Sequence, residues 1–202
     1  MLDIKKEEYI SKYIVGVDEV GRGPLAGPVV SAAVILNKNF DIKELNDSKK
    51  LTKNKREQIY NNIISQCEYK IGFANVSEID KLNILQASLL SMKRAVEKLN
   101  LKKEYKILVD GPWPFDKNNK NIIPCIKGDA TYPSIAAASI VAKVYRDNYM
   151  LNLSKNFSHY LWEQNSGYGT KKHLDAIKKY GICEHHRKSF GPIHKMLSPK
   201  LK

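Results

Sequence analysis

The order of apolar and polar positions along the chain predicts five short strands. Each candidate combines β-branched or aromatic residues with turn signals nearby, and the five lie at residues 13–17, 29–36, 69–76, 105–109 and 122–126. The first strands follow one another as in a meander, and the later ones alternate with helical patterns. This order predicts an α/β fold with a mixed five-stranded sheet flanked by helices.

Apolar residues at helical spacing predict four helices. These cover residues 52–64, a longer segment from 77 to about 99, residues 133 to about 153, and residues 170–180. The small residues at 136–139 would allow the third helix to pack closely on the sheet. Gly181 ends the fourth helix.

A single domain is the simplest organisation for these elements. The 202 residues contain no repeat and no low-complexity linker. Residues from about 155 to 202 are expected to form a helical C-terminal part that completes the substrate site. With 43% apolar and 27% charged residues, the composition is typical of a soluble globular protein. No apolar run is long enough for a bilayer, and the first residues do not resemble a signal peptide. We therefore expect a cytoplasmic protein with no membrane partner.

The net charge of +13 favours a polyanionic partner such as nucleic acid. However, only five of the 34 basic residues are arginine, and a lysine-rich composition can also reflect a bias of the genome. Charge alone therefore leaves nucleic-acid binding open.

Cysteine usage argues against a disulfide framework and against a structural zinc site. Cys67, Cys125 and Cys183 are widely spaced, and the chain has no C-x-x-C motif. Glu184, His185 and His186 follow the last of them, but this spacing fits no common set of metal ligands.

Acidic residues follow three of the predicted strands. Asp18 and Glu19 end the first, Asp110 ends the fourth, and Asp129 comes shortly after the fifth. Sites in α/β sheets gather at the carboxyl ends of parallel strands, so these four acids are expected to converge. Oxygen-only ligands favour magnesium or manganese, and two such ions can clamp a phosphoryl displacement. The competing interpretation is that each acid serves only in a turn or as a helix cap.

The doublet raises a geometric difficulty. Neighbouring side chains on a regular strand point to opposite faces, so Asp18 and Glu19 cannot both face one metal from an ideal strand. The glycines at 21 and 23 allow a turn that would swing Glu19 back.

Motifs along the chain resemble those of the ribonuclease HII family, in the family's order. They are VDEVGRGPLAGPV at 17–29, NDSKKL at 46–51, VDG at 109–111, KGD at 127–129, IAAASIVAKVYRD at 135–147, GYGTKKH at 167–173 and HRKSF at 186–190. The resemblance covers about residues 13–193, nearly the whole chain.

The resemblance implies a ribonuclease H-like fold and an endonuclease that hydrolyses the RNA strand of RNA–DNA hybrids. It also implies cutting 5′ to ribonucleotides embedded in duplex DNA by a two-metal-ion mechanism, which leaves 3′-hydroxyl and 5′-phosphate ends. The cofactor is expected to be Mg²⁺ or Mn²⁺, two ions with substrate. The family's four acids match Asp18, Glu19, Asp110 and Asp129, the set that the strand ends indicate.

The resemblance also assigns substrate contacts. Backbone groups of Gly21, Arg22 and Gly23 are expected to contact the ribose 2′-hydroxyl, the group that distinguishes RNA from DNA at one nucleotide. Tyr168 is expected to stack on the sugar after the ribonucleotide. Contacts with the phosphate backbone fall on Lys49, Arg187 and Ser189.

Several alternatives stay open. Asp147 is a rival for the fourth metal ligand, although its place inside a helix suits an ion pair or an outer role better. His173 and His186 are expected to hold loops rather than transfer protons. Ribonuclease HIII carries an extra N-terminal domain and typically a glutamate as its fourth acid, so Asp129 favours ribonuclease HII.

Other functions and partners remain as alternatives. Another nuclease of the same fold group, such as a junction resolvase, would share the acids, and a basic nucleic-acid-binding protein would use them only to cap turns. We expect a monomer. A sliding clamp docking at residues 193–202 is a further option that the sequence does not support.

Overall fold

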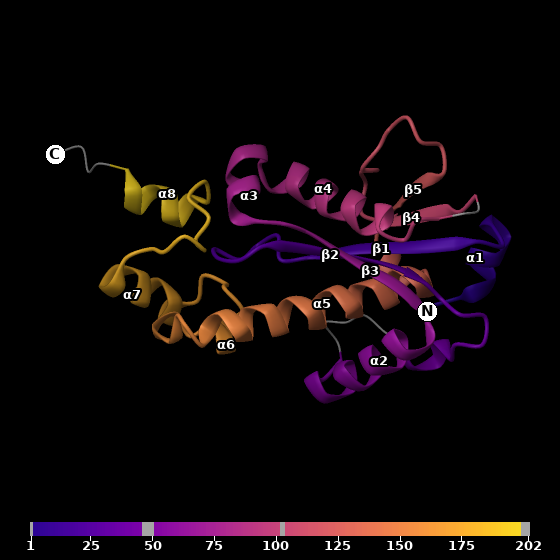
Figure 1. Cartoon of the computed structure of the whole chain (residues 1–202), viewed down its shortest axis with the longest axis horizontal. Helices are drawn as coiled ribbons and strands as arrows, with labels where there is room; N and C mark the ends of the chain where they lie inside the picture. Colours follow the sequence, from indigo (N-terminus) through magenta and orange to yellow (C-terminus); the bar gives the residue numbers. More distant parts are fainter. Residues whose placement is uncertain (1, 46–50, 102–103, 199–202) are drawn as a thin grey trace.

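The computed structural model describes residues 2–45, 51–101 and 104–198. Its centre is a five-stranded sheet with helices α3 and α4 on one face and helices α2 and α5 on the other (Figure 1). The strands are β1 (Ile14–Val20), β2 (Val29–Ile35), β3 (Glu68–Ala74), β4 (Lys106–Asp110) and β5 (Ile122–Cys125).

The sheet is mixed, as predicted. Its order is β3-β2-β1-β4-β5, with antiparallel pairing from β3 to β1 and parallel pairing from β1 to β5. In the parallel pair, Val17 of β1 lies opposite Val109 of β4. Asp18 and Asp110 follow these two residues directly, so the sheet brings both acids to the same edge.

The helices of the described residues are α1 (Ile4–Ile10), α2 (Lys53–Gln66), α3 (Val76–Leu82), α4 (Ile84–Glu97), α5 (Pro133–Ser154), α6 (Trp162–Asn165), α7 (Lys171–Tyr180) and α8 (Gly191–Leu197). Short 3-10 turns lie at Ile42–Glu44, Gly128–Ala130 and Ser158–Tyr160. The predictions for α2, α5 and α7 are confirmed to within a few residues. The sequence patterns did not predict α1, α6 or α8.

The prediction of one long helix from 77 to about 99 was wrong. The segment forms two helices that meet at Asn83, whose φ of 69° breaks the helical path. The Asn83 side chain then accepts a hydrogen bond from the Gln86 backbone N–H at 3.1 Å and so caps α4. The apolar periodicity runs through both helices, which is why it concealed the break.

Helix α5 packs directly on β1, as its run of small residues predicts. Ala136, Ala137 and Ala138 are completely buried. On the strand side, a side chain at Gly16 would collide with the backbone of Ser134 and Ile135. This close approach places the first half of α5 under the strand that carries Asp18.

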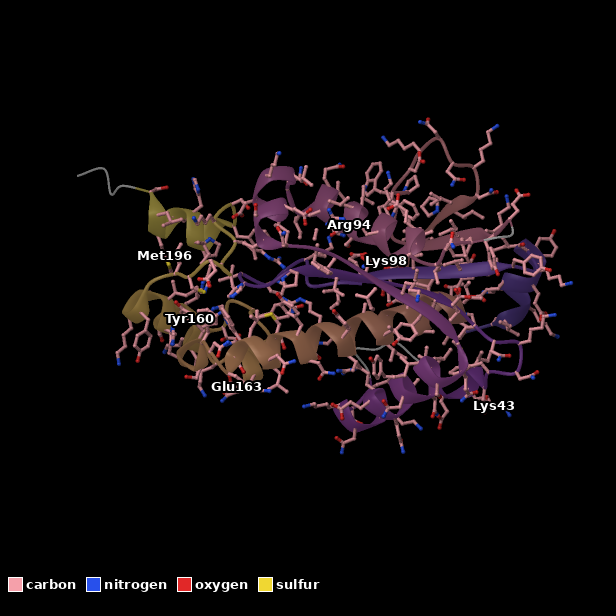
Figure 2. All side chains as sticks on the ribbon, in the orientation of Figure 1. Lys43, Arg94, Lys98, Tyr160, Glu163 and Met196 are labelled. Carbon is pink, nitrogen blue, oxygen red and sulfur yellow. The ribbon has the colours of Figure 1, made fainter. Side chains whose placement is uncertain are left out.

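The C-terminal helices gather at one end of the sheet (Figure 1). Tyr160, labelled in Figure 2, is buried there with Trp162 and Ile193 against Leu25 from the segment after β1. Leu25 also donates its backbone N–H to the Gly167 carbonyl at 2.8 Å. The C-terminal part therefore encloses the chain that follows the acidic doublet. Within the described residues, no helix is long and apolar enough to cross a membrane.

Candidate active site at the carboxyl edge of the sheet

Asp18 is a buried acid on the face of β1 that meets α5. Its side chain is 6% exposed, and its Oδ1 accepts the Glu19 backbone N–H at 2.7 Å. Burial raises the pKa of Asp18 well above its ordinary value, and the charges of Glu19 and Asp110 raise it further. A hydrogen bond with Ser139 of α5 opposes this shift.

Glu19 faces the other side of the strand. Strand β1 continues through Val20, with Glu19 paired to Ser31, so the expected swing of Glu19 around the glycine turn does not occur. Its carboxylate instead accepts a hydrogen bond from Arg22 at 3.3 Å. Burial raises the pKa of Glu19, Arg22 lowers it, and the charge of Asp110 raises it. Both members of the doublet therefore sense Asp110, although they leave the strand in opposite directions.

Asp110 connects the doublet to the segment that carries Asp129. Its Oδ1 accepts the Gly128 backbone N–H at 2.7 Å, at the start of the 3-10 turn that contains Asp129. Asp129 itself is half-buried. The structure thus brings Asp18, Glu19 and Asp110 within electrostatic reach of one another and places the Asp129 turn against Asp110.

These acids do not form a closed set of ligands by themselves. Across the described ranges, no three His, Cys, Asp or Glu side chains are grouped so that they could hold a metal ion. The residues covered by this finding include Cys183, Glu184, His185 and His186. Asp147 is engaged elsewhere, since its Oδ1 lies 2.7 Å from Lys143 Nζ in an ion pair within α5. This fits the ion-pair interpretation of Asp147.

Arg187 holds the glycine-rich turn from beneath. Its side chain is completely buried, and its guanidinium donates to the carbonyls of Gly27 (2.9 Å), Arg22 (3.0 Å) and Gly21 (2.6 Å). This placement differs from the predicted contact with a nucleic-acid backbone, because a completely buried side chain presents no surface to a duplex. Burial lowers the pKa of Arg187 to about 9, and the nearby charge of Arg146 acts in the same direction.

Arg146 supports the same turn from α5. It donates to the carbonyls of Pro28 (3.0 Å), Ala26 (3.0 Å) and Ser166 (2.9 Å) and is 1% exposed. Together the two guanidiniums fix backbone carbonyls from residue 21 to residue 28. Nothing in the sequence pattern indicated this role for Arg146, because an arginine inside a helix is usually solvated. The available signal was that Arg146 lies within the family motif at residues 135–147.

Tyr168 stands beside the turn. Its side chain is 44% exposed, and a Cβ placed on Gly23 would lie 3.4 Å from its ring. Ser189 is exposed, and its hydroxyl donates to Asp80 Oδ1 at 2.6 Å. Lys49 falls outside the described residues. Of the predicted substrate contacts, Tyr168 and the turn therefore lie together, and Ser189 lies on a separate loop tied to α3.

A buried pair of histidines fixes the loop that carries Tyr168. His173 donates its Nδ1–H to the Tyr168 carbonyl at 2.9 Å, because a carbonyl can only accept. Its Nε2 must then accept, and it lies 3.0 Å from Trp162 Nε1 and 3.1 Å from His186 Nε2. His186 accepts the Cys183 backbone N–H on Nδ1, so its proton sits on Nε2. Both rings are neutral and structural, as the loop-holding prediction requires.

The family model for ribonuclease HII matches residues 15–193 of this chain. The chain belongs to the ribonuclease HII family. It is 54% identical over 186 residues to a ribonuclease HII of Pelagibacter ubique, which covers 92% of this chain and 100% of the relative. Membership makes it a ribonuclease H, a metal-dependent hydrolase that cuts the RNA strand of RNA–DNA hybrids.

Solved structures agree with this fold. The ribonuclease H2 of Pyrococcus horikoshii matches with a TM-score of 0.73 at 29% identity, over 91% of this chain and 96% of that one. The Bst ribonuclease HIII in complex with Mn²⁺ also gives a TM-score of 0.73, at 21% identity over 91% of this chain and 68% of that one. The ribonuclease H-like fold predicted from the motifs is thereby confirmed.

Proposed function

We propose that this ribonuclease HII cuts on the 5′ side of ribonucleotides embedded in duplex DNA, in addition to the RNA strand of hybrids. The observation that carries the proposal is that the acids and the glycine-rich turn share one short segment. Only two residues separate Asp18 from Gly21, so a group that would recognise a 2′-hydroxyl lies beside the group that would serve the chemistry. Cutting would leave a 3′-hydroxyl and a 5′-phosphate.

The acids suit a pair of hard divalent cations by their chemistry, although as placed they are not grouped around one ion, so the cations would have to draw them together. All four donors of Asp18, Glu19, Asp110 and Asp129 are carboxylates, the donors that Mg²⁺ and Mn²⁺ prefer. The raised pKa values of Asp18 and Glu19 show that the fold leaves negative charge there without enough compensation. Two bound cations would supply that compensation, activate a water and stabilise the leaving 3′ oxygen. The choice between the two metals is part of the proposal.

The turn could read a ribose because its backbone is fixed, and because Arg22 and Gly23 are exposed beside the buried Gly21. Gly21 adopts a φ of 95°, and a side chain at this position would collide with Arg146. With the carbonyls of Gly21 and Arg22 held by Arg187, the turn offers a rigid backbone surface to a 2′-hydroxyl. A rigid contact loses little entropy on binding, which favours discrimination of one hydroxyl group.

The remaining residues serve the duplex. Tyr168, beside Gly23, would stack on the sugar that follows the ribonucleotide. Lys49 and Ser189 stay as proposed contacts with the phosphate backbone. Arg187 is reassigned from a direct contact to the support of the turn. The enzyme is proposed to act as a monomer. Helix α8 (Gly191–Leu197) includes residues 193–197 of the segment considered for a sliding clamp.

The test is cleavage of a DNA duplex that contains one ribonucleotide, with Mg²⁺, with Mn²⁺ and with chelator. We expect a single metal-dependent cut 5′ to the ribonucleotide and no cut in an all-DNA duplex of the same sequence. A four-way DNA junction without ribonucleotides serves as the second control, and it should stay intact. Cutting of the junction at a comparable rate, or a cut at another position, would contradict the proposal.

A further inference from the structure

The loop that joins β4 to β5 begins at the acids and rises on the α4 side of the sheet (Figure 1). It carries Trp113, three residues after Asp110. This side chain is 50% exposed, whereas the other tryptophan of the chain, Trp162, is completely buried. None of the residues predicted for substrate binding lies on this loop.

The residues next to Trp113 in the loop keep its side chain pointing outward. Phe115 packs against the core cluster between α4 and the sheet, which anchors the loop two residues further on. Pro112 and Pro114 flank the tryptophan, and each proline ring fixes its own φ. The indole is therefore presented on a restricted backbone rather than at the end of a free loop.

Trp113 lines the same hollow as two of the four acids. Glu19, Asp110 and Arg22 line this hollow together with Trp113, and α4 provides its apolar wall. A half-exposed indole next to carboxylates is stabilised little by hydration and little by packing in the core. Its flat face is instead well suited to a nucleic-acid base, because every base has a π-face on which aromatic side chains stack.

We propose that Trp113 is a stacking platform for a nucleotide of the substrate duplex next to the phosphodiester that is cut. The inference rests on the proposed function, which places that phosphodiester at Asp110 and Glu19. Arg22 at the hollow, and Lys117 and Lys120 further along the loop, supply positive charge for the adjoining phosphates. Tyr168 adjoins Gly23 and Trp113 adjoins Glu19, so the two aromatic side chains would contact different nucleotides.

Tryptophan fluorescence tests this directly. Since Trp162 is buried, a change in emission on duplex binding reports on Trp113. With chelator present so that no strand is cut, an RNA–DNA hybrid should quench the emission and shield it from acrylamide. The same titration of Trp113→Phe should show no change in emission. In parallel, Trp113→Ala should raise the Kd of a labelled hybrid about 5- to 100-fold, and Trp113→Phe by less.

Tyr9→Ala is the matched control, because Tyr9 is 94% exposed on α1, outside this hollow. It should leave both the Kd and the quenching unchanged. An unchanged emission under saturating hybrid, with an unchanged Kd for Trp113→Ala, would overturn the inference. If the native enzyme still cuts the single-ribonucleotide duplex in that case, the proposed function stands. Conversely, quenching without such a cut would support the platform and contradict the proposed function.

Discussion

The charged form of Asp18 is poorly compensated by the rest of the protein chain. Because its pKa is raised by burial and by Glu19 and Asp110, the folded state binds its proton more tightly than the unfolded state does. Ionisation at neutral pH therefore lowers the free energy of unfolding. This cost is consistent with a residue placed for a cation rather than for stability.

Asp18→Asn should separate stability from activity. We expect the variant to melt at a higher temperature than the native chain in metal-free buffer at pH 7, by about 2–4 °C for each kcal/mol gained. Cleavage should fall about 1,000-fold or more, because several kcal/mol of charge stabilisation in the transition state depend on the bound cations. Binding of the duplex should be retained or tightened. Calorimetry and gel assays of the same preparation measure these effects.

Asp175→Asn is the control for this substitution, since Asp175 is an exposed acid on α7. It should change neither the melting temperature nor the rate by a measurable amount. A lower melting temperature for Asp18→Asn would mean that the charge of Asp18 is already compensated within the fold.

Arg187 is the residue whose observed role departs most from its predicted one. Arg187→Lys keeps the charge but cannot reach three carbonyls at once, so at least one buried acceptor loses its partner. We expect the free energy of unfolding to fall by about 2–4 kcal/mol in urea titrations. At temperatures where Arg187→Lys is still folded, we also expect a lower ratio of its cleavage rate at a single ribonucleotide to its cleavage rate on long hybrids.

Lys188→Ala is the neighbouring control, because Lys188 is exposed and its backbone N–H, which the substitution keeps, contacts Asp80. It should retain the stability and the cleavage ratio of the native chain. If Arg187→Lys lost stability and kept that ratio, the guanidinium would stabilise the fold without tuning the turn.

Among the secondary-structure elements, the α3–α4 junction is the clearest case of a single residue defining two helices. Asn83→Ala would keep the positive φ, which favours asparagine and glycine, and would remove the cap of α4. We expect a loss of about 1–3 kcal/mol in the free energy of unfolding, measured by urea titration. Asn83→Gly relieves the backbone strain but also lacks the cap, so its loss should be smaller. Equal losses would show that only the cap contributes.

The strands could be predicted from the sequence to within about three residues, and so could α2, α5 and α7. Their periodicity reflects which face is buried, and burial is what the pattern encodes. The break at Asn83 was missed because both helices bury the same face. Helices α1, α6 and α8 have 7, 4 and 7 residues and are too short to show a period.

The site shows the same division. Strand ends and family motifs agree on the four acids, and the structure places Asp18 and Asp110 at the same edge of the sheet, while their role as metal ligands stays a prediction. Strand geometry predicted that Asp18 and Glu19 point in opposite directions, and they do. The glycine turn was expected to swing Glu19 back towards Asp18, but this does not occur. The roles of Arg146 and Arg187 depend on contacts with residues more than 100 positions away, and no local pattern carries that information.

At the scale of the whole molecule, a low pH should weaken the packing of the C-terminal helices against the rest of the chain. Burial lowers the pKa of His173, and it lowers that of His186 to about 4, where His173 adds to the shift. An unfolded histidine titrates near 6.5. Between about pH 6.5 and 4 the unfolded chain therefore takes up protons that the folded chain refuses, so these histidines lower stability as the pH falls. Asp18 and Glu19 act in the opposite direction.

A difference measurement isolates the histidines. His186→Asn should have a lower free energy of unfolding than the native chain at pH 7. The difference between the two free energies should shrink by a few kcal/mol towards pH 4, because each unit of pKa shift corresponds to about 1.4 kcal/mol. His194→Ala, at an exposed histidine of α8, should run parallel to the native chain throughout. A constant gap for His186→Asn would mean that His186 is not held neutral. Urea titrations at each pH give the comparison.

The contacts of Arg187 also imply an order in which parts of the structure can form during translation. Its partners Gly21, Arg22 and Gly27 are translated some 160 residues before it, and Gly27 also donates to the His185 carbonyl at 2.9 Å. Domains emerge from the ribosome N-terminus first, so the sheet and its acids can form while the turn still lacks its support. A growing chain would thus form the strand ends that carry the acids early, and would add the support of the proposed ribose-recognising turn only when translation has passed residue 187. The turn itself is thus among the first parts of the chain to be made, and its support is among the last.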